Sequence, residues 1–151
     1  MPEKTTLERA ERAKREGKSP STQAGEFVRE EMEHIRRGKH GARSTKQAIA
    51  IGLSKARRAG VKLPPPKKGR VQESTRRSAE REYRKGQAHP RKPTPRRITR
   101  TRQEVLKREP RQAASRGALS QQARTAARKR SKASRQAAAR KGARTRQRKA
   151  A

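Results

Sequence analysis

The sequence predicts an all-α protein in which a small N-terminal helical domain is followed by a largely disordered basic tail with transient helices. Charged residues make up 39% of the 151 residues, hydrophobic residues 26% and aromatic residues 1%. A chain of this composition cannot bury enough apolar surface to offset the entropy of ordering every residue. Its apolar residues recur at helical spacing mainly before residue 64. We therefore expect the folded part in residues 1–63, with about three short helices.

The first two helices are predicted from their start signals and apolar faces. The first extends from about Thr5 to Gly17. The Ser19-Pro20 pair is typical of a helix start, and a second helix is expected from about Thr22 to Arg37. Phe27 lies on the apolar face of this second helix, so we expect it in the core.

The third predicted helix, Ser44 to Gly60, has the clearest signals. Ser44 and Gln47 have the spacing of a capping box, and Gly60 can take the left-handed conformation that ends a helix. Ile49, Leu53 and Ala56 recur at helical spacing and predict one apolar face. With the second helix and the short connection between them, this helix would form a helical hairpin.

Ile51 lies outside the apolar face predicted for the third helix. An isolated exposed isoleucine is the simpler explanation, and we favour it slightly. A homodimer formed through the N-terminal helices is the alternative.

Residues 64–110 are predicted to be a basic linker with short helices. The linker opens with three consecutive prolines, which make the chain stiff. A charged helix is expected over residues 73–85, solvent-bridging or only partly formed because it has almost no apolar face. An extended proline-rich segment should occupy residues 89–97, and one more short helix should lie between Thr101 and Pro110.

Residues 111–151 are predicted to be a disordered tail rich in Ala, Arg and Lys. They contain 14 basic residues, no acidic residue and one large apolar residue, Leu119. Low complexity of this kind argues against a stable fold. The alanine content permits a helix once phosphates neutralise the charge.

The net charge of +33, from 46 basic and 13 acidic residues, is the main indication of function. Nucleic acid is the polyanion expected to neutralise such a chain. Only Phe27 and Tyr83 are aromatic, so base stacking has little support and we expect binding to the backbone of double-stranded DNA without sequence specificity. This would be a histone-like, nucleoid-associated role. Two alternatives stay open: an RNA- or ribosome-associated basic protein, and a protein-interaction domain in residues 1–63 that is anchored by the basic tail.

The candidate nucleic-acid-binding residues lie in three places. Lys46, Arg57 and Arg58 are predicted to form a basic face on the third helix. This face could contact nucleic acid, and a plain solvated helix face explains the same pattern equally well. The tail predicted to be disordered supplies the largest group of candidates: Arg124, Arg128, Lys129, Arg130, Lys132, Arg135, Arg140, Lys141, Arg144, Arg146, Arg148 and Lys149.

Arg96 and Arg97 are the third group of candidates. They follow Thr94-Pro95 in a pattern typical of extended arms that lie in narrow minor grooves. A proline-rich spacer is the explanation we favour for this short pattern.

Metal, cofactor and catalytic sites have little support. His34 and His40 with Glu30 or Glu31 are a weak metal candidate, and surface histidines are the preferred interpretation of these two and of His89. The chain has no Asp, no Cys and no glycine-rich phosphate loop. We therefore expect no enzymatic activity, no cofactor and no metal.

No apolar run in the sequence is long enough for a transmembrane helix or for a secretory signal. We therefore expect a cytoplasmic protein, associated with the nucleoid if the source is bacterial.

The blocks TQAGEFVREEM, GKHGARS and KQAIAIGLSKARRAG, together with the residues around them, resemble a family of small bacterial basic proteins classed as a domain of unknown function. The resemblance covers roughly residues 4–70 closely and the rest loosely, and the segment LKREPRQAASRGALS resembles longer members. The resemblance implies membership of the family, and it assigns no function because the family has no established activity. The tail separately resembles, in composition, the basic tails of linker-histone-like proteins.

Overall fold

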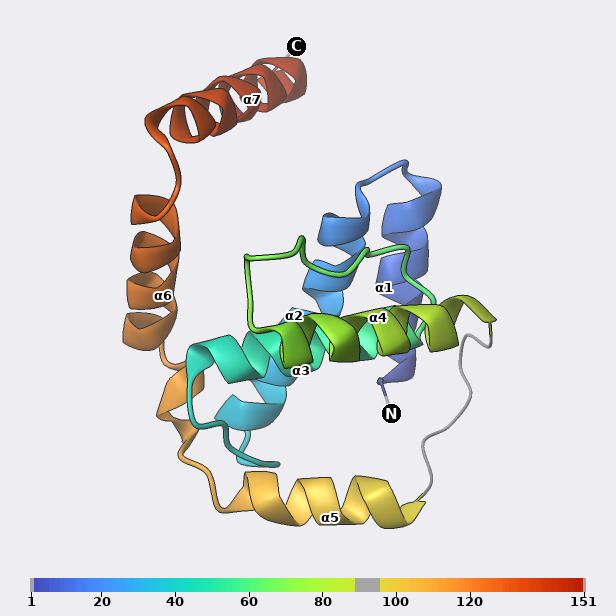
Figure 1. Ribbon diagram of the computed structural model, residues 1–151. Helices are drawn as coiled ribbons and strands as arrows, with labels where there is room; N and C mark the ends of the chain where they lie inside the picture. Colours follow the sequence, from blue (N-terminus) through green and yellow to red (C-terminus); the bar gives the residue numbers. More distant parts are fainter. Residues whose placement is uncertain (1, 89–95, 151) are drawn as a thin grey trace. The chain divides into compact units, whose positions relative to one another are not determined.

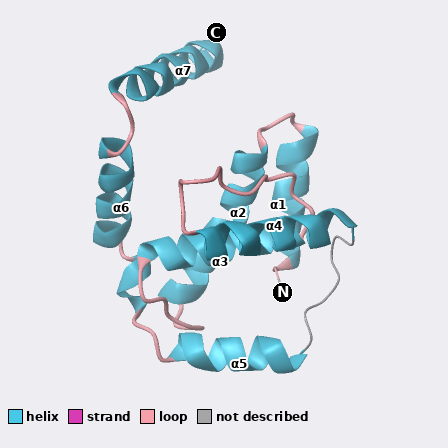
Figure 2. Cartoon of the chain, in the orientation of Figure 1, coloured by secondary structure: helices cyan, strands magenta, loops and turns pink. Residues whose placement is uncertain are grey.

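The computed structural model of the protein describes residues 2–88 and 96–150. These residues form seven α-helices, one short 3-10 helix and no strand (Figures 1 and 2). The predicted all-α class is therefore confirmed. Two compact units are distinguished, Met1–Ser115 and Arg116–Ala151. The boundary that we predicted after residue 63 does not coincide with the boundary between these units.

The first unit contains α1 (Lys4–Arg15), α2 (Pro20–Arg36), α3 (Thr45–Arg58), α4 (Glu73–Ala88), α5 (Arg96–Lys107) and the 3-10 helix η1 (Arg111–Ala114). The second unit contains α6 (Arg116–Arg128) and α7 (Lys132–Ala150). The first three helices lie where the sequence predicts them, to within a few residues. None of the helices in the described residues has the length and apolar character needed to span a bilayer.

Local signals set the ends of α2 and α3 as predicted. Ser19 caps α2, and Pro20 is its first residue. Ser44 Oγ accepts the N–H of Gln47 at 3.2 Å, while Gln47 Oε1 accepts the N–H of Arg43 at 2.7 Å. Gly60 follows α3 with a φ of 92°, in the left-handed region that glycine adopts without steric cost.

Small residues recur along the buried side of α3. Ala48, Gly52 and Ala56 recur every four residues and are buried. The predicted stripe of Ile49, Leu53 and Ala56 is therefore displaced, because Ile49 and Leu53 are only half-buried. Small side chains on the facing side allow two helix backbones to approach closely. The small residues are therefore the buried ones in α3, and the larger Ile49 and Leu53 lie at the edge of the contact.

The backbones of α2 and α3 come into direct contact at Gly52. A Cβ atom at this position would lie 2.7 Å from Val28 Cα and 2.9 Å from Val28 N. Phe27 and Ile35 of α2 are fully buried, which confirms that Phe27 is a core residue. The core cluster around Phe27 is completed by Ala10, Ala24, Ala56 and Val61.

Helix α4 packs on α3 instead of belonging to a free linker (Figure 1). Arg58 Nε lies 2.9 Å from Glu82 Oε2. A Cβ at Gly86 would overlap the carbonyl oxygen of Arg57, so the two backbones touch at this glycine. The expectation of a solvent-bridging or partly formed helix is wrong, because the charge on α4 is used in a contact between helices.

The end of α5 and the chain that follows it contact the connection between α2 and α3. The N–H groups of Gly41 and Ala42 donate to the carbonyls of Leu106 and Pro110 at 2.8 and 3.0 Å. The 3-10 helix η1 then contacts both α2 and α3. Residues up to 115 therefore complete the first unit.

The second unit corrects the prediction of a disordered tail. Its two helices cover most of residues 116–150, and α6 buries none of its residues. Alanine, arginine, lysine and glutamine have high helix propensity, and no proline follows Pro110. Local propensity thus forms these helices without a hydrophobic core.

Gly52→Ala should destabilise the protein by about 1–3 kcal/mol, because the new methyl group meets the backbone of Val28. The matched control is Gly25→Ala on the exposed side of α2, where a Cβ meets nothing within 4 Å. This control should stabilise α2 by up to about 1 kcal/mol through helix propensity. Chemical denaturation of the full chain measures both. Similar effects of the two substitutions would contradict the close contact of α2 and α3.

Glu73 at the start of α4 should titrate at unusually low pH. Hydrogen bonds from Arg76 and, to a lesser degree, Arg77 lower the pKa of Glu73 from 4.5 to about 2. Because the folded-state pKa is depressed, the stability that these contacts give α4 is present above about pH 4.5 and is lost as the pH falls toward 2. Glu73→Gln should reduce the helicity of α4 at pH 7 and equal the wild type below about pH 2. Carboxylate and amide NMR shifts across this range provide the measurement.

Candidate functional site

The predicted basic face of α3 is only partly assembled. Lys46 is exposed. Arg57 is 7% exposed, and its Nε donates to the carbonyl of Leu63 at 3.3 Å. Burial lowers the pKa of Arg57. Arg58 is paired with Glu82, as described above, so α4 covers the side of α3 that the sequence suggested was free.

Arg96 and Arg97 are the first two residues of α5. The expectation that they belong to an extended arm is therefore wrong for these two positions, and their side chains lie outside the described residues. Thr94 and Pro95, the other half of the proposed groove-binding pattern, also lie outside them.

The predicted cations of the second unit lie on α6, on α7 and in the turn between them. Every one whose side chain is described is exposed: Arg124, Arg128, Lys129, Arg130, Lys132, Arg135, Arg140, Lys141, Arg144, Arg146 and Arg148. Lys149 is in α7, but its side chain lies outside the described residues. The second unit thus presents a dense array of accessible positive charge.

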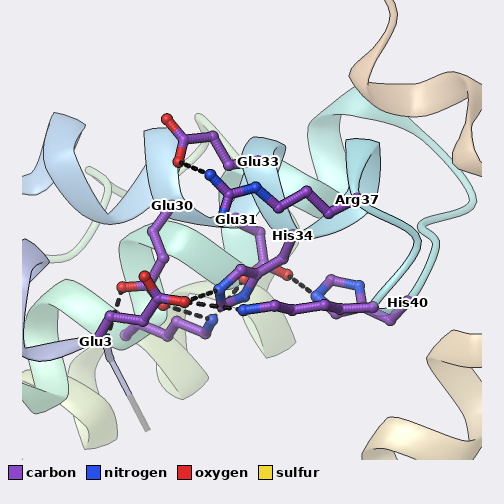
Figure 3. A network of polar contacts seen from close by, with 9 residues as sticks. Glu3, Glu30, Glu31, Glu33, His34, Arg37 and His40 are labelled. Carbon is purple, nitrogen blue, oxygen red and sulfur yellow. Dashed lines mark hydrogen bonds and ion pairs between the residues drawn. The ribbon is translucent and has the colours of Figure 1, made fainter.

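A buried polar cluster between α2 and α3 contains the residues that the sequence indicates only as a weak metal candidate, namely Glu30, Glu31, His34 and His40 (Figure 3). Glu30 and Glu31 of α2 are 4% and 0% exposed. Lys55 of α3 reaches both, with its Nζ 3.3 Å from Glu30 Oε1 and 2.7 Å from Glu31 Oε2. One lysine thus faces two buried carboxylates.

His34 and His40 extend this cluster, so the expectation of surface histidines is wrong for both. Their side chains are 12% and 10% exposed, and the rings meet edge-on with centroids 6.1 Å apart. His40 Nε2 lies 3.2 Å from Glu31 Oε1, and its Nδ1 lies 3.0 Å from the carbonyl oxygen of Gly41. The loop after α2 carries His40 back over the helix, which brings together two histidines that are six positions apart.

Glu3 ties the start of the chain to the same cluster (Figure 3). Its carboxylate accepts a hydrogen bond from Lys39 Nζ at 2.9 Å and lies 2.8 Å from His34 Nε2. The bond from Lys39, followed by the contact with His34, lowers the pKa of Glu3 from 4.5 to about 2. Its backbone N–H donates to Glu30 Oε2 at 3.0 Å. The cluster therefore joins α1, α2, α3 and the α2–α3 loop.

One sequence signal would have located this cluster. Glu31 lies midway between Phe27 and Ile35 at four-residue steps, so it occupies the centre of the apolar face of α2. A charge in that position requires a partner in the interior. The partner, Lys55, comes from the following helix and has no local pattern that marks it.

Residues 15–68 match the model of a family described as "Family of unknown function (DUF6496)". The match confirms, for this part of the chain, the resemblance to a domain of unknown function. It spans α2 and α3 and therefore includes Glu31, His34, His40 and Lys55. No curated protein and no solved structure matches the chain.

Lys55→Met should destabilise the first unit by about 3–5 kcal/mol, because it leaves two buried carboxylates without their shared cation. Lys46→Met is the matched control, since Lys46 is exposed on the same helix. Its effect should stay within about 0.5 kcal/mol. Denaturant unfolding monitored by circular dichroism compares the two. A destabilisation below about 1 kcal/mol for Lys55→Met would show that the interior carboxylates do not depend on this lysine.

Proposed function

We propose that the protein binds nucleic acid, preferentially double-stranded DNA, through phosphate neutralisation by the exposed cations of α6 and α7. The observation that carries the proposal is the array of exposed arginines and lysines in the second unit, in a stretch where no acidic residue follows Glu109. Each cation that neutralises a phosphate releases condensed counterions, which gives affinity without sequence specificity.

The distribution of charge on α7 favours contact with the phosphate backbone over base reading. Arg140, Arg144 and Arg148 recur every four residues and form one stripe. At about 100° per residue, Arg135 and Arg146 lie on roughly the opposite side of the helix. A helix with cations around its circumference can engage phosphates in many orientations, as non-specific binding requires.

Like charges on α7 also couple its helicity to the bound polyanion. The four-residue stripe places positive side chains as neighbours on the helix surface, which costs about 0.2–0.5 kcal/mol for each pair. Phosphates placed between these side chains would remove that repulsion. Helix content in the second unit should therefore rise when nucleic acid binds.

The positions of the aromatic residues support a preference for duplex over single strands. Phe27 is fully buried, and Tyr83 is half-buried on α4. Proteins that bind single strands stack bases on exposed aromatic rings. The first unit would then orient the protein or recruit a partner, and a bacterial nucleoid would be the corresponding location. An RNA- or ribosome-associated role is the competing proposal.

Replacing Arg140, Lys141, Arg144, Arg146 and Arg148 together with Gln should weaken duplex binding and flatten its salt dependence. The slope of log affinity against log salt should fall by up to about 4.5, or about 0.9 for each phosphate that the variant no longer neutralises. Fluorescence anisotropy with the full chain, a duplex DNA, a single strand and a structured RNA of equal length provides the measurement.

The control replaces the four arginines of this set with lysine, which keeps the charge and should preserve the salt slope. An unchanged slope in the glutamine variant would refute neutralisation by α7. Tighter binding of structured RNA than of duplex DNA at the same salt would favour the RNA-associated role.

A further inference from the structure

We propose that Glu31, His34 and His40 form a binding site for a divalent transition-metal ion such as Zn²⁺. Each of the three residues offers one ligand atom, and these atoms all lie within 4.8 Å of one another. Two imidazoles and a carboxylate are ligands that Zn²⁺ takes in proteins, with bonds of about 2.0–2.2 Å. Small side-chain movements suffice to bring the three donors to such distances.

The backbone positions the three donors for a shared ion. Glu31 and His34 are three residues apart on α2, so they are neighbours on one helix face. His40 approaches from the loop that follows α2, and Figure 3 shows its ring turned toward Glu31. Hydrogen bonds from Gly41 to the last turn of α5 and from Ala42 to the chain that follows it hold this loop in place.

The hydrogen bonding of His40 requires a cation between its ring and Glu31. The carbonyl oxygen of Gly41 can only accept, so Nδ1 of His40 carries the proton that points to it. In the neutral ring, Nε2 then has a lone pair, and it faces Glu31 Oε1 at 3.2 Å. Two acceptors at this distance repel unless a proton or a metal ion lies between them.

Charge balance in the cluster points the same way. Among the described residues, Lys55 supplies one positive charge to the two buried carboxylates of Glu30 and Glu31. Neither oxygen of Glu31 has a hydrogen bond of good geometry, although Lys55 and His40 lie close to it. Buried charge is costly unless it is compensated, so the interior requires a further cation.

Both histidines already have the outer partner that a metal-bound imidazole takes. Such a ring donates its second N–H to a carbonyl or a carboxylate, which fixes its orientation. The Gly41 carbonyl serves His40 in this way, and the Glu3 carboxylate serves His34. A protonated His40 with no metal is the competing explanation of the same contacts, and the experiment separates the two.

The test is a calorimetric titration of the full, tag-free chain with Zn²⁺ at neutral pH. One equivalent should bind, and His34→Gln and His40→Gln should each weaken binding by at least about tenfold, since removing an outer-shell partner alone costs about 10- to 100-fold. His89→Gln is the matched control and should bind like the wild type. No saturable binding, or equal affinity in all three variants, would overturn the proposal.

A second measurement on the unaltered chain covers the case in which a histidine variant fails to fold. Long-range ¹H–¹⁵N NMR reports the protonation of each ring nitrogen. With one equivalent of Zn²⁺, His40 should keep its Nδ1 proton while the Nε2 resonance shifts as expected for a metal-bound nitrogen. If Nε2 of His40 is protonated at neutral pH and Zn²⁺ changes neither ring, the cluster is an ion-pair network of the protein alone.

Discussion

The close contact between α2 and α3 is the constraint on which the rest of the first unit depends. Gly52 lets the two backbones meet at Val28, and the same helix pair brings Lys55 to Glu30 and Glu31. Helix α1 packs on α2, α4 packs on α3, and η1 contacts both α2 and α3. A wider spacing of the central pair would therefore loosen the packing and, at the same time, separate the buried carboxylates from their cation.

The sequence was sufficient to predict the helices whose ends carry local signals. Ser19-Pro20, Ser44 and Gly60 act within a few residues of themselves, so α2 and α3 follow from short-range chemistry. The buried face of α3 was harder to predict from the sequence. Hydropathy indicates Ile49 and Leu53 as the buried residues, whereas the close contact between the helices buries Ala48 and Gly52. Which small residues face a partner helix depends on how closely that helix approaches.

Local sequence patterns did not predict the interactions between distant parts of the chain. The docking of α4 depends on Arg58 meeting Glu82 and on a glycine at position 86, and neither feature is distinctive by itself. The histidine cluster depends on a loop that reverses over α2. The helical tail, in contrast, was misjudged because its charge was given more weight than its alanine content.

The two units use charged residues in opposite ways. All 13 acidic residues lie at or before Glu109, and many of them pair with lysines and arginines of the first unit. In that unit a cation such as Arg57 or Lys55 is a structural element. The second unit contains no acidic residue that could pair with its cations. Those whose side chains are described are exposed to solvent and can bind a polyanion.

The hydrogen bonds from Gly41 and Ala42 to Leu106 and Pro110 also impose an order on folding. During synthesis α1, α2 and α3 emerge first and can pair, but the N–H groups of the α2–α3 loop find their acceptors only after the segment through residue 110 has been made. Such a contact, distant along the chain, forms late because the entropy of closing the loop must first be offset. The loop that carries His40 is thus the last part of the cluster to become fixed. A nascent chain that has released only its first three helices holds His40 on a loop that still lacks these backbone acceptors.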